Sequence, residues 1–191
     1  LDCGATYHFR AFAENIDGIG YGDDLSFNTD DCPSTPPCTG TCPFITTWKT
    51  DNPGGSASNQ ITIPTNGGGY NYDVDWGDTS TSSGQTGDST HTYSSPGTYT
   101  VKITGTFPRI YFCNNGDKDK ILTIEQWGAN PWTSMDCAFR GVSNLSIPAT
   151  DTPDLTNVTS MRNIFSSTAN FNSDIGSWDV SHVTDMQNAF Y

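Results

Sequence analysis

Hydrophobic positions in the last third of the chain repeat at a nearly fixed offset. Three pairs of Met and Phe, each pair four residues apart, follow one another at offsets of 26 and 25 residues: Met135 and Phe139, Met161 and Phe165, and Met186 and Phe190. A period of this length is typical of stacked repeat arrays, in which one unit has too few apolar residues to bury a face alone. The pattern therefore predicts a solenoid over residues 108–191, with the Met and Phe positions as a core ladder.

Each unit of this array has the spacing of a short helix followed by a polar loop. Val158, Met161 and Phe165 are three and then four residues apart, which predicts about two helical turns. The stretch that follows is rich in Asn, Ser, Asp and Gly and is predicted to be a loop. Trp127 and Trp132 precede the first repeated pair, and we expect them to cover the apolar end of the array.

Binding in a repeat array normally falls on polar loop positions of one face, because the ladder residues are buried. Six polar loop residues are therefore candidate binding residues: Asn170, Asn172, Asp174, Ser177, His182 and Asp185. An alternative is that Asn172 and Asp174 only hydrogen-bond the loop backbone, as short polar side chains often do.

The string FNSDIGSWDVSHVTDM at residues 171–186 resembles the repeat of BspA-like bacterial surface proteins, a leucine-rich-repeat-like class. The resemblance covers about residues 108–191. It departs from the family pattern at Ile164 and Ala189, where a second Met is usual, and at Val142, where Cys is common; all three remain apolar. The resemblance implies a leucine-rich-repeat-like solenoid with short helices, which presents its loops to an extracellular protein or glycan.

The middle of the chain alternates apolar and polar residues in short runs separated by Gly- and Ser-rich turns. The strand-like runs are residues 44–50, 60–64, 70–76, 91–93 and 97–107. Runs of this length and spacing predict a small β-sandwich over residues 44–107. Residues 121–124, in the part that joins the sandwich to the repeats, are also strand-like.

Two strings in this sandwich, YDVDWGD at 72–78 and HTY followed by PGTYTV at 91–101, resemble the PKD module, an immunoglobulin-like sandwich. Some PKD modules bind Ca²⁺, so the resemblance makes Asp73, Asp75 and Asp78 candidate calcium ligands. A calcium site needs about six oxygen ligands. The competing interpretation is that Asp78 only fixes the turn and Trp76 only fills the core.

Residues 1–30 alternate as a hairpin that turns near Asp17 and Gly18. They resemble the last two strands of a fibronectin type III module, and two strands alone are marginally stable in water. Residues 31–43 are a linker rich in Cys and Pro. The expected fold class is thus mainly β: a partial fibronectin type III hairpin, a PKD-type immunoglobulin-like sandwich, and then the solenoid.

Six cysteines, an even number, favour disulfides and an oxidising compartment. If facing hairpin residues have numbers that sum to about 35, Cys3 faces Cys32. The expected pairs are Cys3–Cys32, Cys38–Cys42 and Cys113–Cys137, although other connectivities remain open. The alternative is a metal site in the linker, but its three cysteines lack a fourth ligand and a nearby His.

Charge and motifs narrow the range of functions. The 21 acidic and 8 basic residues give a net charge of −13, which disfavours nucleic-acid binding because the chain repels phosphate. No apolar run approaches the roughly 20 residues of a membrane span. The three histidines, His8, His91 and His182, lie in separate segments, and no hydrolase, zinc-protease or nucleotide-binding motif is present. We therefore expect no enzyme and no cofactor, apart from the possible Ca²⁺.

These features together predict a piece of a longer extracellular cell-surface protein that mediates adhesion through its solenoid. The chain begins at Leu1 rather than Met and ends at Tyr191 directly after the third Met–Phe pair, so we expect a fragment. The alternatives are a non-catalytic accessory region of a secreted hydrolase, and a structural stalk or sheath subunit. A catalytic motif upstream would favour the first alternative, and self-association would favour the second.

Overall fold

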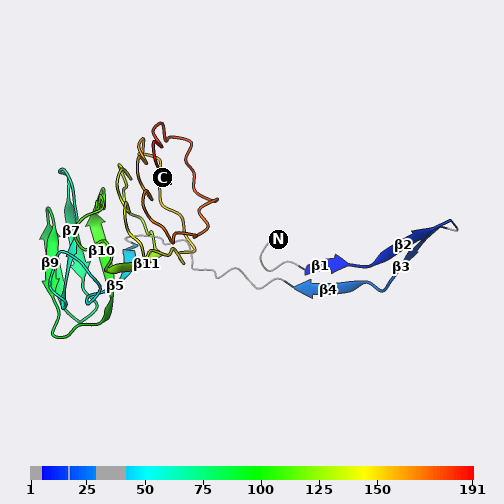
Figure 1. Ribbon diagram of the computed structural model, residues 1–191, viewed down its shortest axis with the longest axis horizontal. Coiled ribbons are helices and arrows are strands. Elements are labelled where there is room, and N and C mark those ends of the chain that lie inside the picture. Colours follow the sequence, from blue (N-terminus) through cyan, green and yellow to red (C-terminus); the bar gives the residue numbers. More distant parts are fainter. Residues whose placement is uncertain (1–5, 17, 29–41) are drawn as a thin grey trace. The chain divides into compact units, whose positions relative to one another are not determined.

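The computed structural model describes residues 6–16, 18–28 and 42–191, which fall into two units (Figure 1). The first unit is the predicted hairpin. Its outer pair is β1 (Thr6–Phe9) with β4 (Leu25–Asn28), and its inner pair is β2 (Phe12–Asn15) with β3 (Gly18–Tyr21). Both pairs are antiparallel.

The hairpin register differs slightly from the expected one. Phe9 faces Leu25 in the outer pair, so facing numbers sum to 34, and Phe12 faces Tyr21 in the inner pair, so they sum to 33. The predicted sum was about 35. The break between the two strand pairs accounts for the change along the hairpin. Cys3 and Cys32, whose pairing rested on that sum, lie outside the described residues.

The hairpin leaves much of its apolar surface in solvent. More than half of the surface of six large apolar side chains is exposed: Phe9, Phe12, Ile16, Ile19, Tyr21 and Leu25. A two-stranded ribbon has no second layer against which such residues can pack, which is why isolated hairpins are marginally stable.

The second unit begins with two antiparallel sheets. One sheet has the strand order β11-β5-β10-β7-β8, formed by β5 (Phe44–Lys49), β7 (Asn71–Asp75), β8 (Thr81–Gln85), β10 (Thr98–Thr106) and β11 (Ile121–Gln126). The other pairs β6 (Gln60–Ile63) with β9 (Ser89–Thr92). Every second residue of β5, beginning with Phe44, is buried. The predicted strand is thus present, with one face toward the core.

Two strands of the larger sheet differ from the sequence prediction. β8 was not predicted, because its sequence TSSGQ contains no apolar residue. It forms at the sheet edge by pairing with β7. β11 lies beyond the expected sandwich boundary at residue 107, but it pairs with β5 and extends the same sheet. The sandwich and the segment after it therefore share a sheet.

The repeats form stacked turns rather than helices. We name the turns tier 1 (residues 134–141), tier 2 (160–167) and tier 3 (185–191). Alternate backbone N–H groups of tier 1, from Met135 to Gly141, donate to carbonyls of residues 160–166, and those of tier 2 donate to residues 185–191, at 2.7–3.0 Å. Each bond thus joins residues 24 or 25 apart, and tiers 1 to 3 are stacked by their backbones.

The predicted helices at residues 158–165 and 183–190 are wrong, since the described residues contain no α-helix. Cys137, Asn163 and Asn188 occupy equivalent tier positions and have φ of 59°, 54° and 56°. A residue in this left-handed region ends a helical path. The N–H of Phe165 consequently donates to Ala189 in the next tier and not to Met161 four residues back. The described residues also contain no helix with the length and apolarity for crossing a membrane.

The predicted core ladder is confirmed in tiers 1 and 2, where the Met and Phe side chains are buried. The Phe139 and Phe165 rings stack with centroids 5.9 Å apart, and those of Phe165 and Phe190 lie 5.8 Å apart. In tier 3, by contrast, Phe190 is 65% exposed. At the other end, Trp127 is fully buried and contacts both Phe44 of the sandwich and Phe139 of tier 1. One apolar core therefore runs from the sandwich into the tiers.

Candidate functional site

The predicted binding residues lie on the loop between tier 2 and tier 3 and at the start of tier 3. Several of them hydrogen-bond the backbone. Asp174 accepts a hydrogen bond from the N–H of Gly176 at 2.8 Å, and Asn170 donates to the carbonyl of Ser143 at 3.4 Å. The alternative interpretation of Asp174, as a residue that bonds the loop backbone, is thus confirmed.

Asp185 also has a structural partner, because it occupies a position that recurs in every tier. Its carboxylate accepts from the N–H two residues later, at 2.9 Å. The hydroxyls of Ser134 and Ser160 do the same at the start of tiers 1 and 2, at 3.2 and 3.4 Å. A short polar side chain at this position therefore starts each turn.

Three of the six candidates remain available for an outside ligand. Asn172, Ser177 and His182 are all exposed. Neither Asn172 nor Ser177 makes a side-chain hydrogen bond within the described residues. The ring of His182 contacts the neighbouring Ser181 hydroxyl, at 3.2 Å through Nδ1. We call these three exposed residues the loop strip.

The predicted calcium ligands each engage a different partner. Asp73 accepts from the N–H of Gly84 at 2.8 Å, and Asp75 accepts from the N–H of Gly77 at 3.0 Å. Asp78 accepts from the Ser80 N–H at 3.0 Å and from its hydroxyl. No group of three or more acidic, His or Cys side chains that could hold a metal ion occurs in the described part of the chain. Calcium stays a prediction without a defined site.

The Asp78 turn contains a residue that sequence reasoning missed. His91 places Nε2 at 2.8 Å from Asp78 and 3.2 Å from the Ser80 hydroxyl. Its ring stacks on Trp76, with centroids 4.9 Å apart. Hydrogen bonds from Ser80, joined by the contact with His91, lower the pKa of Asp78 to about 2, against a smaller opposing effect of burial. No local sequence signal identifies this pair, because residues 78 and 91 meet only through the arrangement of the strands.

These three side chains resemble a hydrolase triad in composition but not in geometry. A proton relay needs the nucleophile to hydrogen-bond one ring nitrogen of the histidine and the carboxylate to hydrogen-bond the other. Here the same Nε2 atom contacts both Ser80 and Asp78. The cluster therefore locks the turn and has no path for a proton relay.

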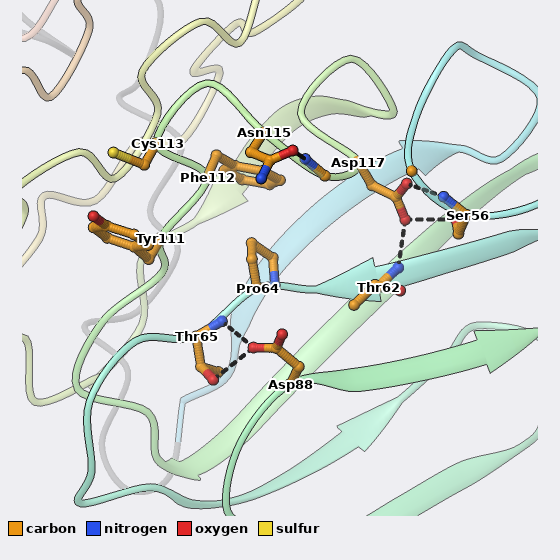
Figure 2. A pocket seen from close by; sticks show the side chains of 12 residues that line it. Ser56, Thr62, Pro64, Thr65, Asp88, Tyr111, Phe112, Cys113, Asn115 and Asp117 are labelled. Carbon is orange, nitrogen blue, oxygen red and sulfur yellow. Dashed lines mark hydrogen bonds between the residues drawn. The ribbon is translucent and has the colours of Figure 1, made fainter.

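A pocket of about 350 Å³ lies between the end of β6 and the segment 111–117 (Figure 2). Two carboxylates line it, and both already accept hydrogen bonds from other residues of the protein. Asp88 accepts from the N–H and hydroxyl of Thr65 at 2.7 and 2.8 Å. Asp117 accepts from the Ser56 N–H and hydroxyl and from the Thr62 N–H, at 2.6–2.9 Å. The pocket can thus admit a small polar molecule, but its carboxylates are structural.

Asp117 belongs to a buried polar cluster behind the pocket. The Lys120 side chain is fully buried, and its Nζ donates to four oxygens of residues 56–60 at 2.8–3.1 Å. That Nζ also lies 3.8 Å from Asp117. Burial lowers the pKa of Lys120, and the charge of Asp117 opposes this effect. The cluster therefore ties the loop before β6 to the segment before β11.

The expected Cys113–Cys137 disulfide is not formed in the structure, where both residues are free thiols. The two residues are nevertheless neighbours, since the Cys113 N–H donates to the Cys137 carbonyl at 3.0 Å. Proximity alone does not form the bond, which requires an oxidant. Cys42 is disulfide-bonded. Cys38, its expected partner, lies outside the described residues.

Comparison with known families adds one match. Residues 112–191 match the model of a family described as "Mycoplasma protein of unknown function, DUF285". The match covers β11 and all three tiers but none of the strands before β11. Neither a curated protein nor a solved structure matches this chain.

Proposed function

We propose that this chain is part of an extracellular cell-surface protein, without catalytic activity, that adheres to a protein or glycan through the loop strip. The observation that carries the proposal is the availability of Asn172, Ser177 and His182 beside neighbours that are committed to the backbone. Exposed amide, hydroxyl and imidazole groups are suited to hydrogen-bonding a polar ligand. The net charge of −13 disfavours nucleic acid as that ligand.

The resemblances stated above give this proposal its finer form. We interpret the tiers as a BspA-like, leucine-rich-repeat-type solenoid, the sandwich as a PKD-type module and the first unit as part of a fibronectin type III module. The backbone bonds at offsets of 24 and 25 residues support a repeat array. An array of turns is a rigid base for loops, as is common in binding proteins.

The sandwich has a second role in this proposal beyond that of a spacer. Trp127 and Trp132 pack between Phe44 of the sandwich and the first tier. A stacked array needs such a cover, because its first unit otherwise exposes an apolar face. The sandwich thus caps the array whose loops bind the ligand.

Adhesion of beads that carry the full chain tests the proposal. The beads flow over surfaces coated with fibrinogen, fibronectin, collagen or mucin, and the fraction of beads retained is measured. We expect retention on at least one surface and its loss in the variant Asn172→Ala, Ser177→Ala, His182→Ala. The matched control is Thr81→Ala, Ser83→Ala on the sandwich, which should retain adhesion. Equal adhesion of both variants, or none by the folded wild type, overturns the proposal.

The alternatives predict different results in the same experiment. An accessory region of a hydrolase would bind insoluble polysaccharide and none of the four coated surfaces. A stalk or sheath subunit would self-associate in sedimentation and ignore every surface. Adding a chelator to the adhesion assay tests calcium as well, since removal of a bound ion would weaken retention.

A further inference from the structure

Two thiols meet where the segment 111–117 packs on tier 1. Cys137 is buried and Cys113 is partly exposed. Their backbones are hydrogen-bonded at 3.0 Å, and each thiol affects the pKa of the other. The neighbouring N–H groups of Phe112 and Asn114 also donate to this tier. Several backbone bonds thus hold the two cysteine residues side by side.

The surroundings of the two thiols are different. Cys113 lies at the edge of the 350 Å³ pocket, which Tyr111 also lines (Figure 2). Burial raises the pKa of Cys113, but hydrogen bonds from Cys137, Tyr111 and Arg140 outweigh it, so that the net pKa is lowered. Burial, together with the contact to Cys113, raises the pKa of Cys137 to about 11. A thiolate is the reactive form of cysteine, so reactivity is concentrated on Cys113.

We propose that Cys113 and Cys137 form a reactive dithiol, in which Cys113 attacks a small external disulfide and Cys137 completes the exchange. This goes beyond a structural disulfide, because it assigns different roles to the two sulfurs and names the class of oxidant. It does not depend on the adhesive function proposed above.

The exchange balances as follows. The Cys113 thiolate attacks one sulfur of the small disulfide, its S–S bond breaks, and the first small thiol leaves and takes a proton from water. The product is a mixed disulfide on Cys113. Cys137 then loses its proton and attacks the sulfur of Cys113, which expels the second small thiol. Two protein thiols are oxidised to one disulfide, and one small disulfide is reduced to two thiols.

The new bond would join the segment 111–117 to tier 1 and close a loop of about 25 residues, a constraint that stabilises the folded chain against the unfolded one. Oxidation should therefore raise the melting temperature, and a reductant should reverse the rise.

The test is reaction of the reduced full chain with oxidised glutathione, followed by alkylation, trypsin digestion and mass spectrometry. Cleavage after Arg109, Lys118, Lys120 and Arg140 places Cys113 in peptide 110–118 and Cys137 in peptide 121–140. The other four cysteines fall in peptides 1–10 and 11–49. The expected product is a link between 110–118 and 121–140; its absence overturns the proposal.

Two variants assign the roles. Cys137→Ser should stop the exchange midway and leave one glutathione on Cys113, whereas Cys113→Ser should leave Cys137 unmodified. Modification of Cys137 at an equal rate in the second variant overturns the assignment. A measurement on the unaltered reduced chain needs no variant: iodoacetamide should alkylate Cys113 more than about tenfold faster than Cys137, since only the thiolate reacts. Equal rates contradict the proposal.

Discussion

The β-sandwich and the stacked tiers share an apolar core, but they fix their backbones in different ways. In the sandwich, strands far apart in sequence pair, and one buried cluster around Asp117 and Lys120 holds the loop before β6. In the tiers, every joining bond spans 24 or 25 residues, and one kind of polar side chain starts each turn. The sandwich therefore depends on contacts that occur once, whereas the tiers depend on contacts that recur. Equivalent positions in different tiers can thus serve as internal controls.

The largest effect is expected in the sandwich. Asp117→Ala leaves the fully buried ammonium of Lys120 without its carboxylate and two backbone N–H groups without an acceptor. Breaking a buried ion pair costs about 3–5 kcal/mol of unfolding free energy. Urea denaturation followed by Trp fluorescence measures it. The matched control is Asp119→Ala, which removes a partly exposed pair with Lys118 and should cost about 1 kcal/mol or less. Similar losses for both variants would contradict the unique role of the cluster.

The next largest loss of stability is expected in the Met–Phe ladder. Met135 is fully buried in tier 1, and Met186 is 44% exposed in tier 3. Met135→Ala should cost about 2–5 kcal/mol, because it removes buried surface and leaves a cavity. Met186→Ala, the same change at the equivalent position, should cost much less. Parallel urea titrations compare the two variants, and equal costs would show that position in the stack does not govern stability.

The left-handed tier residues predict a smaller effect. Asn163 has φ of 54° and makes no side-chain hydrogen bond within the described residues, so its contribution is conformational. Asn163→Ala should cost about 1 kcal/mol, since a Cβ without a polar group is disfavoured there. Asn163→Gly should be close to neutral, because Gly adopts this φ without penalty. Thermal unfolding of the two variants checks the difference, and a larger loss for Gly would contradict the explanation.

The smallest effect concerns pH. The folded pKa of Asp78, about 2, lies below its ordinary value of 3.8. The stabilisation is therefore fully present above about pH 4 and is lost as pH falls through 2. Ser80→Ala removes the strongest cause of the shift and should reduce this acid-dependent loss. Urea midpoints between pH 6 and 2 measure it, with Ser83→Ala as the control. An unchanged acid profile in Ser80→Ala would refute the role of that hydroxyl.

The sequence predicted the two regions unequally well. Alternation located β10, because burial on one face of a strand has a period of two. The Met–Phe offsets located the ladder. The same spacing of three and four residues, however, predicted helices where tiers occur, because apolar periodicity does not report where N–H groups bond. Asn163 and Asn188 were a usable signal, since Asn favours the left-handed region.

The candidate site was predicted only in part, for a related reason. The loop residues were found, but the sequence did not separate Asp174 and Asp185, which bond the backbone, from Asn172, which does not. The partnership of His91 with Asp78 joins residues 13 apart across a turn. It depends on how the two strands are arranged, and no local pattern encodes that arrangement.

Strand β11 also limits where recombination can divide the coding sequence. It pairs with β5 on one side, and Ser146 bridges it on the other. A recombination event that joined new coding sequence at residue 108 would deprive the sandwich of its edge strand and leave Phe44 without Trp127. A segment that evolution transfers must therefore carry β5 together with β11, even though the family match begins at residue 112.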